Sequence, residues 1–449
     1  CWKEAFIKKN IHLLYHALLS RKDETAQHLF VHIVDNGRTL KASDFPKHEH
    51  IYLHSNKNTG GSGGFARGIL ESVYQKKQRE QKEKITHIQL MDDDILLQPD
   101  SIYRTYILLK HLKRERQDDF ISGAMLYMER AFIQKEDVGM VSRNAEFVPL
   151  KREFNHKDLR ENLMNEKKYS DAENCYAAWW YCCMPVSVVK KYGLPLPLFV
   201  RGDDIEYGLR CRPRFLTMNG ICVWHMGFVG KMNAAMDFYQ VDRNLLIIRA
   251  VSGVLKNVRI LRKLRMDFLR SILRFDYDSA QLVVRALEDY LKGPEFIKKD
   301  CGEQILKENS RLVHTMKPLE TLGTFEAMVG SPYEKIELGR IERLIYKITC
   351  NGHLLFPEGR LRREMMSVPF NDVYIPGRAA FRTKLLAVNP AAGTGYLLVR
   401  DKKRFWRLVI RYCRAVRRYR RDNSRLMEEY AASKHELMSE RFWREYLEI

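Results

Sequence analysis

The acidic segment 89–97, QLMDDDILL, constrains the chain more than any other stretch. The apolar residues before it predict a buried strand, which ends where Asp92, Asp93 and Asp94 arrive together. Three adjacent carboxylates repel one another and lose solvation if they are buried without a cation. On an extended backbone Asp92 and Asp94 project to the same side, so they can share one Mg²⁺ or Mn²⁺ ion. The alternative is a solvated turn or the acidic start of a helix.

A glycine-rich stretch, NKNTGGSGG at residues 56–64, precedes the acidic segment. It follows predicted strands at 29–34 and 51–53 and opens a helix predicted to run from Phe65 to about Lys82. Glycines let backbone N–H groups approach a phosphate or ribose, although a flexible turn has the same composition. The stretch is neither GxGxxG nor a P-loop, which disfavours a dinucleotide site or a simple NTPase. Strands alternating with helices, with acids at a strand's carboxyl end, predict an α/β domain.

A second acidic pair, Asp203 and Asp204, stands where a helix is predicted to begin. Acids there can simply favour the helix dipole, or one of them can act as a general base at the mouth of a pocket. His225, next to a tryptophan, is either a packed core histidine or the nitrogen ligand that completes a carboxylate metal site. The pair Trp179 and Trp180 is more typical of core packing than of a sugar contact, and both interpretations stay open.

The charge of the chain implies an anionic partner. The formal net charge is +21, which suits a nucleotide diphosphate, an anionic lipid, an acidic polymer or a nucleic acid. We expect no nucleic acid, because acids at the crevice would repel phosphate and no zinc, RRM or helix-turn-helix signature occurs. The 9 cysteines form no CxxC pair, which favours a reducing, cytoplasmic setting. We find no spanning apolar run and no signal peptide, but the chain begins with Cys1, as a fragment would.

The length predicts two domains, an α/β domain over residues 1–245 and a mainly helical domain over residues 246–449. Residues 121–128 predict one strand with Gly123 inside it, and residues 370–399 are β-like. Residues 404–425 predict a basic amphipathic helix, which is either a helix packed on the domain or one drawn to anionic lipid headgroups. Its arginines recur every three or four residues: Arg404, Arg407, Arg411, Arg414, Arg418, Arg421 and Arg425.

Together these motifs resemble the family-two inverting glycosyltransferases, and among them the bacterial galactofuranosyltransferases that polymerise galactan. The resemblance covers about residues 25–250. It is carried by the following motifs: Asn58 with the glycine stretch, Asp92–Asp94, Trp179–Trp180, LPLPLF before Asp203–Asp204, and Trp224-His225-Met226.

The resemblance implies a GT-A fold, which is a Rossmann-like α/β fold, with UDP-galactofuranose as donor and Mn²⁺ or Mg²⁺ as cofactor. It implies that Asp92, Asp94 and His225 hold the metal. Asp204 would be the catalytic base, and Asp203 beside it would bind acceptor hydroxyls. Trp179 and Trp180 would line the acceptor groove. The donor contacts would be Asn58, Gly60, Gly61, Gly63, Gly64, Asp35 and Asp93.

The family also implies a setting for the reaction. We expect transfer to a hydroxyl of a growing cell-surface glycan or lipid-linked glycan, in the cytoplasm or peripherally on the inner face of the cell membrane, with a homo-oligomer as a further hypothesis. Members carry an N-terminal β-rich domain and an opening nucleotide-binding strand, which we expect to be absent here. The stretch before the tryptophan pair lacks the expected glycine, which concerns acceptor binding. The alternatives are another UDP- or dTDP-sugar as donor, or a sugar-binding module without catalysis.

Overall fold

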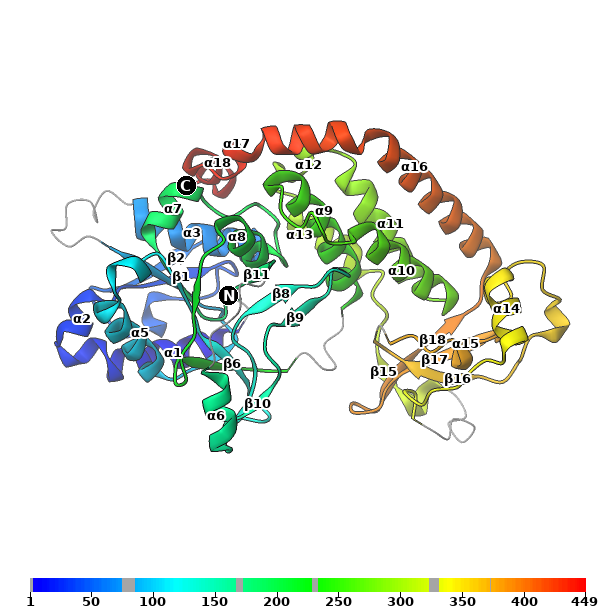
Figure 1. Cartoon of the computed structure of the whole chain (residues 1–449), viewed down its shortest axis with the longest axis horizontal. Helices are drawn as coiled ribbons and strands as arrows, with labels where there is room; N and C mark the ends of the chain where they lie inside the picture. The colour runs from blue at the N-terminus through cyan, green and yellow to red at the C-terminus, as the bar shows by residue number, and fades with distance from the viewer. Residues whose placement is uncertain (1–2, 75–84, 167–172, 228–232, 323–330, 372) are drawn as a thin grey trace.

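The computed structural model describes residues 3–74, 85–166, 173–227, 233–322, 331–371 and 373–449. Figure 1 shows an elongated molecule with three regions along its axis: an α/β region, a group of helices and a small second sheet. The long helix α16 (Lys402–Ala432) runs from the small sheet back toward the α/β region, so that the C-terminus lies beside the N-terminal half. Within the described ranges, no helix combines the length and the apolar character needed to cross a bilayer.

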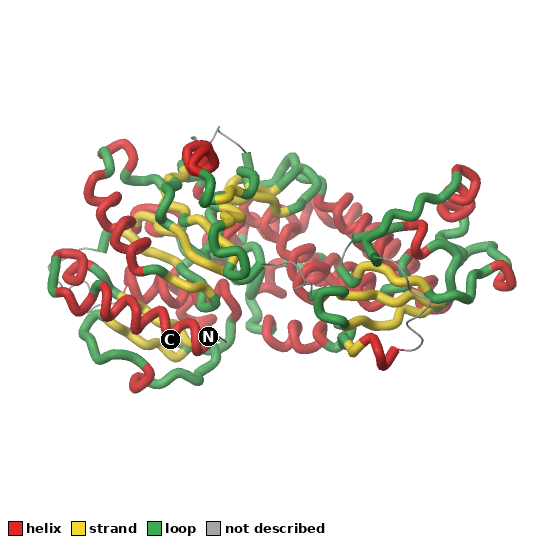
Figure 2. The backbone as a smooth tube through the Cα atoms, turned by 90° about the horizontal axis from the view of Figure 1, so that it is seen from below, coloured by secondary structure: helices red, strands yellow, loops and turns green. Residues whose placement is uncertain are grey.

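The α/β region begins with β1 and β2, which pair in parallel with Val31 opposite Ile51. Its other strands form sheets of order β13-β5-β12-β3, β10-β7-β6-β14-β4 and β11-β8-β9. Figure 2 shows these strands with helices on both sides. The elements, in chain order, are α1 (Glu4–Ala17), α2 (Glu24–His28), β1 (Val31–Asp35), β2 (Ile51–Ser55), α3 (Gly60–Tyr74), β3 (His87–Leu90), β4 (Ile95–Leu97), α5 (Pro99–His111), β5 (Phe120–Ser122), β6 (Ala124–Tyr127), β7 (Ile133–Glu136), β8 (Gly139–Val141), β9 (Phe147–Pro149), β10 (Phe154–Asn155), α6 (Leu159–Asn165), β11 (Cys175–Tyr176), β12 (Cys182–Pro185), α7 (Val186–Tyr192), α8 (Asp203–Cys211), β13 (Phe215–Leu216) and β14 (Cys222–His225).

The chain passes several times between the two larger sheets, and two of these crossings fall on segments that the sequence analysis singled out. The first crossing is the acidic segment, because β3 and β4 lie at the edges of different sheets. The second is at Gly123, between β5 and β6. The single strand predicted over residues 121–128 is therefore wrong. A Cβ on Gly123 would lie 2.4 Å from Cδ1 of Tyr181, so the close approach of that ring requires glycine where the chain changes sheets.

Helices and a small sheet make up the second half. The sheet has the order β15-β18-β17-β16, and its strands β17 and β18 confirm the β character predicted within residues 370–399. The predicted boundary at residue 245 falls inside α9, and one hydrophobic core includes residues from both sides of it. The elements are α9 (Val241–Ser252), α10 (Ile260–Leu273), α11 (Tyr277–Tyr290), α12 (Pro294–Ile297), α13 (Gly302–Ser310), β15 (Lys317–Pro318), α14 (Arg340–Ile348), β16 (Met366–Pro369), α15 (Pro376–Ala379), β17 (Lys384–Asn389), β18 (Thr394–Val399), α16, α17 (Lys434–Leu437) and α18 (Glu440–Leu447).

The apolar side of α16 packs on the helices of the middle region. Phe405, Leu408 and Tyr419 are buried there. Arg404 Nη2 lies 2.6 Å from Asp278 Oδ1, and two nitrogens of Arg411 donate to Glu288. Two of the predicted stripe of arginines therefore tie α16 to α11, which fits the interpretation of a helix packed on the protein.

The helix predicted from Phe65 is confirmed up to Tyr74 as part of α3, which begins earlier, at Gly60; residues 75–82 of the prediction lie outside the described residues. The last helix, α18, packs beside it. Trp443 of α18 is fully buried, and its Nε1 donates to the carbonyl oxygen of Pro195 at 2.9 Å. Helix α18 is thus part of the same hydrophobic core as the N-terminal half.

Candidate active site

The acidic segment and His225 meet at the edge of the five-stranded sheet. Strand β14 pairs antiparallel with β4, which places His225 opposite Ile95. Asp94 is next to Ile95 in the chain, and its Oδ1 lies 3.2 Å from Nε2 of His225. The structure thus brings together two of the three predicted metal ligands, which are far apart in the sequence.

Asp92 lies in a strongly acidic environment. Burial raises its pKa to about 7, with the neighbouring charge of Asp94 as the next cause. Asp203 and Asp93 raise the pKa of Asp92 further, while His225 lowers it. The carboxylates of Asp92, Asp93, Asp94 and Asp203 therefore lie near one another in a site that is partly shielded from water. Such a cluster favours a bound cation, because a cation would offset the repulsion.

The donor set of Asp92, Asp94 and His225 suits a divalent metal ion chemically. Carboxylate oxygens suit Mg²⁺ and Mn²⁺, and the imidazole favours Mn²⁺ over Mg²⁺. However, within the ranges that the structure describes, no three His, Cys, Asp or Glu side chains are arranged to hold a metal ion by themselves. The residues fit a site that the oxygens of a bound diphosphate would complete, which is how Mg²⁺ is usually held beside nucleotides.

Asp203 and Asp204 begin α8 as predicted, after Gly202 in the left-handed conformation (φ 90°). Asp203 is buried, whereas Asp204 is partly exposed. Burial raises the pKa of both carboxyls, and the charge of Asp203 raises the pKa of Asp204 further. A carboxylate with a raised pKa is a stronger base, so the partly exposed Asp204 can accept a proton from a bound hydroxyl.

The glycine stretch forms the first turn of α3 and abuts the segment that leads to this acidic pair. A Cβ on Gly60 (φ +71°) would lie 2.1 Å from the carbonyl oxygen of Phe199. The same oxygen accepts a hydrogen bond from the backbone N–H of Ser62 at 3.1 Å. A Cβ on Gly61 would lie 3.3 Å from Oδ2 of Asp203. Close packing against the 199–203 segment therefore requires these glycines, in addition to the donor contact that the sequence predicts.

The other predicted donor residues lie around the same helix end. Cβ atoms on Gly63 and Gly64 would lie 1.8 Å from Oγ1 of Thr59 and 3.1 Å from Nδ2 of Asn36. The side-chain oxygen of Asn58 accepts a hydrogen bond from the N–H of Gly60 at 3.3 Å. Asp93 is partly buried between the two predicted metal ligands. Contact of these residues with a nucleotide stays a prediction.

Asp35 shapes the loop that follows β1. Its carboxylate accepts backbone hydrogen bonds from Gly37, Thr39 and Leu40 at 3.0, 2.7 and 2.8 Å. Burial alone would raise its pKa, but the pKa is lowered overall, and the backbone hydrogen bonds from Leu40 and Gly37 contribute to the lowering. The carboxylate therefore has a structural role, and its predicted contact with the nucleoside is not tested.

The two tryptophans are packed in the core, which fits the packing interpretation. Trp179 is 4% exposed and makes edge contacts with Phe65 and Tyr207, at ring distances of 4.8 and 5.8 Å. Trp180 is 8% exposed, and its ring centre lies 6.4 Å from that of His225. Trp180 is thus the one of the pair that lies beside the acidic site. The predicted contact of either ring with an acceptor stays a prediction.

Three residues near the site had no role in the sequence analysis. Glu136 of β7 is buried, burial raises its pKa to about 7, and its charge acts on Asp204. Arg201, in the left-handed conformation, lowers the pKa of Asp203. Lys57, within the glycine-rich stretch, pairs its ammonium with Asp300 and Glu448. Arg201 and Lys57 carried a local signal, since Arg201 stands two residues before the acidic pair and Lys57 beside Asn58.

Comparison with known proteins connects this geometry to a family. Residues 18–221 match the family described as "Glycosyltransferase like family 2". The chain is 28% identical over 291 residues to the galactofuranosyltransferase GlfT2 of Mycolicibacterium smegmatis, covering 59% of this chain and 42% of that protein. It is 28% identical over 262 residues to the galactofuranosyltransferase GlfT2 of Mycobacterium tuberculosis, covering 55% of this chain and 39% of that protein. The chain spans less than half the length of both relatives.

The matched residues contain the glycine stretch, the acidic segment and the Asp203–Asp204 pair, while His225 follows just after them. The predicted fold class, a GT-A α/β domain followed by a mainly helical region, is confirmed. Residues 18–221 are therefore similar to the family 2 glycosyltransferases, and the chain is similar to the galactofuranosyltransferases.

Proposed function

We propose that the chain transfers a sugar from a nucleotide diphosphate donor to a hydroxyl group of a glycan, with inversion at the anomeric carbon. The observation that carries the proposal is the meeting of two acidic groups, Asp92–Asp94 with His225 and Asp203–Asp204, beside the glycine-rich start of α3. The first group suits a cation–diphosphate complex, and the second offers a base. The similarity to galactofuranosyltransferases supports galactofuranose, carried by UDP, as the sugar.

Asp204 is the residue that we assign as general base. The acceptor oxygen attacks the anomeric carbon on the face opposite the diphosphate, and its proton passes to the Asp204 carboxylate. The bond between the anomeric carbon and the diphosphate oxygen breaks, and its electron pair leaves with UDP. The proton transfer belongs to the transition state, because a sugar hydroxyl is too weak an acid to ionise beforehand. Asp203 is buried beside Gly61 at the start of α3, so it helps to fix the position of Asp204. Its carboxylate can also accept a hydrogen bond from a second hydroxyl of the acceptor.

Asp92, Asp94 and His225 are the residues that would hold Mn²⁺ or Mg²⁺ together with the donor diphosphate. A divalent ion bound there would neutralise the charge that develops on the departing diphosphate. The N-terminus of α3, which lies against Asp203, adds the partial positive charge of a helix start.

The setting of the reaction is also a proposal. We infer a cytoplasmic enzyme that works peripherally at the inner face of the cell membrane on a glycan or lipid-linked glycan, with UDP-galactopyranose, UDP-glucose or a dTDP-sugar as alternative donors. The net charge of +21 supports contact with anionic lipid. Assembly into a homo-oligomer is inferred from the likeness to the family alone.

Calorimetric titration of UDP into the protein, with and without Mn²⁺, tests the donor site. We expect Mn²⁺-dependent binding that is lost in the double variant Asp92→Asn, Asp94→Asn. The matched control is Glu303→Gln with Glu428→Gln, which removes the same charge from exposed positions on α13 and α16. Equal binding with and without the ion would overturn the metal assignment, and absence of UDP binding in both conditions would overturn the donor class. Turnover with a panel of sugar nucleotides then selects the sugar.

A further inference from the structure

Helix α14 turns its apolar side chains away from the protein. Its sequence, RIERLIYKI, places Ile341, Leu344, Ile345 and Ile348 on one stripe of the helix. Ile341 is 76% exposed, Leu344 57% and Ile348 61%. Tyr346, on the opposite side, is buried and anchors the helix in a small core with Leu338, Leu361, Ala380 and Phe381. An amphipathic helix usually hides its apolar stripe, so this orientation needs an external partner.

Basic residues surround the stripe. Arg340, Arg343 and Lys347 of α14 are exposed beside it. A hollow of about 720 Å³ next to the helix is lined by Ile341, Ile345, Phe356 and Phe381, by Arg340, Arg360 and Arg362, and by Glu342, which pairs with Arg362 at 2.9 Å and leaves the charged lining with a net positive charge. Leu355, in the loop after α14, is 99% exposed. The region thus combines apolar side chains with a positively charged border.

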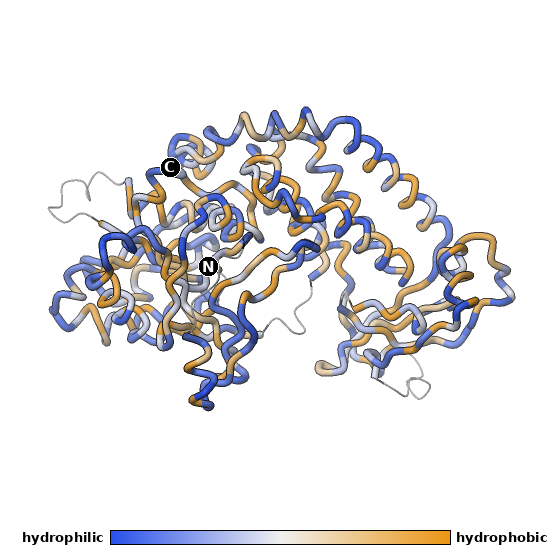
Figure 3. Tube along the Cα trace, in the orientation of Figure 1, coloured by the Kyte–Doolittle hydropathy of each residue, from blue (hydrophilic) through white to orange (hydrophobic). Residues whose placement is uncertain are grey.

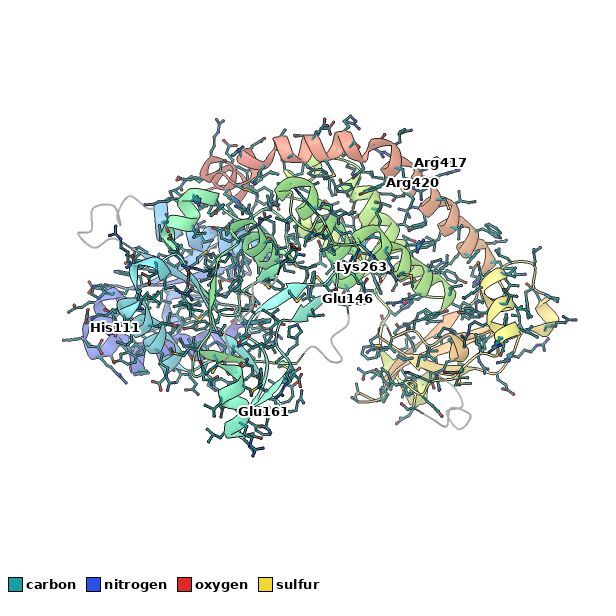
Figure 4. The ribbon with its side chains drawn as sticks, viewed as in Figure 1. His111, Glu146, Glu161, Lys263, Arg417 and Arg420 are labelled. Atoms are coloured by element: carbon teal, nitrogen blue, oxygen red, sulfur yellow. The ribbon has the colours of Figure 1, made fainter. Side chains whose placement is uncertain are left out.

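The start of α16 extends this surface. The loop after α14 contacts it, because His353 stacks on Phe405 at 4.3 Å and Lys402 pairs with Glu358 at 2.9 Å. On the outward side of α16, Trp406 and Ile410 are about half exposed, and the exposed Arg417 and Arg420 follow about two and three turns after Ile410 (Figure 4). Figures 1 and 3 show α14 and the first turns of α16 together, at the end of the molecule far from the acidic site.

The patch stands out within the molecule. Half of the large apolar side chains that are exposed in the described part of the chain lie within residues 331–410. Nothing described in this chain covers the α14 stripe, so its occupant comes from outside. A symmetric contact with a second copy would place the arginines of one α14 against those of the other, which opposes association. An anionic bilayer accepts both features, since apolar side chains enter the acyl boundary and arginines bind the headgroups.

We propose that α14, with Leu355 and the outward face of the start of α16, is the surface that docks this protein on a bilayer containing anionic lipid. The stripe Ile341, Leu344 and Ile348 enters the acyl boundary, and the arginine-lined hollow receives an anionic headgroup. The inference rests on the proposed peripheral membrane location and is independent of the sugar chemistry. It moves the main membrane contact from the arginine stripe of α16 to α14.

Vesicle flotation at low salt tests the proposal, with vesicles of phosphatidylcholine alone or with about 30 mol% phosphatidylglycerol. The variant is Ile341→Ser, Leu344→Ser and Ile348→Ser, which changes exposed side chains only. The matched control, Leu159→Ser with Leu163→Ser, removes an equally exposed apolar pair from α6 of the α/β region. We expect the α14 variant to lose at least about tenfold in affinity for the anionic vesicles, the control to stay within about twofold, and UDP binding to be unchanged in both.

Each other outcome overturns the inference in a distinguishable way. If the wild type binds anionic vesicles and the α14 variant binds equally well, α14 is not the docking surface although the membrane location stands. If the wild type binds neither kind of vesicle, the membrane location fails as well, while UDP titration still reports on the enzyme. If the wild type binds both lipid compositions equally well, the proposed contact between the arginine-lined hollow and an anionic headgroup is wrong. If light scattering shows that the α14 substitutions convert an oligomer to a monomer, the occupant is a second copy of the chain.

Discussion

Replacing Gly60 by alanine should damage the protein more than a change of one methyl group suggests. Gly60 has φ +71°, and the left-handed conformation costs an L-residue about 1–2 kcal/mol. The added Cβ would lie 2.1 Å from the carbonyl oxygen of Phe199, which is backbone and cannot rotate away. Overpacking of this kind costs about 1–3 kcal/mol. We therefore expect Gly60→Ala to lower the free energy of unfolding by about 3 kcal/mol.

The same substitution should also lower turnover. The Phe199 segment leads directly into Asp203 and Asp204, so relief of the overlap moves either the start of α3 or the acidic pair. A shift of about 1 Å at a catalytic group can cost about 100-fold in rate. Turnover of a sugar nucleotide should therefore fall by more than the loss of folded protein explains.

Gly68→Ala is the matched control on the same helix. Its Cβ would meet only Cγ2 of Val34, at an ordinary 3.6 Å. Alanine is the better helix former by about 1 kcal/mol, so this variant should be as stable as the wild type or slightly more stable. Urea unfolding of both variants, together with turnover, makes the comparison. The reasoning is refuted if Gly60→Ala matches the wild type in stability and turnover, or if Gly68→Ala is destabilised as strongly.

Three further variants test, in turn, the general base, the pH dependence of stability and the packing of α18 beside the site. Asp204→Asn should keep the affinity for UDP and lower kcat by about 10²–10⁴, and kcat within about twofold of the wild type would exclude it as the base. His314→Gln should lose about 1–3 kcal/mol of stability near pH 6, because His314 Nε2 lies 2.9 Å from Oδ1 of Asp276. Burial lowers the pKa of His314 and raises that of Asp276, but the pair outweighs burial, so the histidine's pKa is raised and the aspartate's is lowered overall. The loss should therefore shrink as the pH rises through the raised pKa of His314 and as it falls through the lowered pKa of Asp276. Urea unfolding at a series of pH values tests this, and a difference in unfolding free energy between wild type and variant that does not change with pH would contradict it. Trp443→Ala should cost about 3–5 kcal/mol by calorimetry and weaken UDP binding, whereas the exposed Arg441→Ala on the same helix should do neither.

Local patterns predicted the elements whose own apolar period shows which side chains are buried. The strands around the acidic segment, the start of α8 at Asp203 and the apolar side of α16 all show a period that a sequence displays directly. The meeting of Asp94 with His225 was expected only from the family resemblance, and the antiparallel pairing of β4 with β14 produces it. The other predictions needed only the order of residues and the geometry of a strand or helix.

Features that depend on distant partners could not be predicted in this way. The period of residues 121–128 is that of one strand, and only the ring of Tyr181 shows why Gly123 separates two. The stripe of α14 is visible in the sequence, but its orientation toward solvent depends on the small core around Tyr346. Glu136 of β7 is far from the acidic pair in the sequence, and only the fold brings its charge close enough to raise the pKa of Asp204.

The supports of the active site lie largely outside the residues that match the glycosyltransferase family. Asn244 of α9 donates to the carbonyl oxygens of Val200 and Arg201 at 2.9 and 2.6 Å, and so holds the segment that presents Asp203 and Asp204. Lys57, at the start of the glycine stretch, pairs with Asp300 at 3.0 Å and with Glu448 at 2.7 Å. Without the second half, these carbonyl groups and this ammonium would lose the partners that fix their positions. The geometry of the acidic site is therefore a property of the whole described chain, because the helices that follow the family domain hold both of the segments on which its acidic and glycine-rich residues stand.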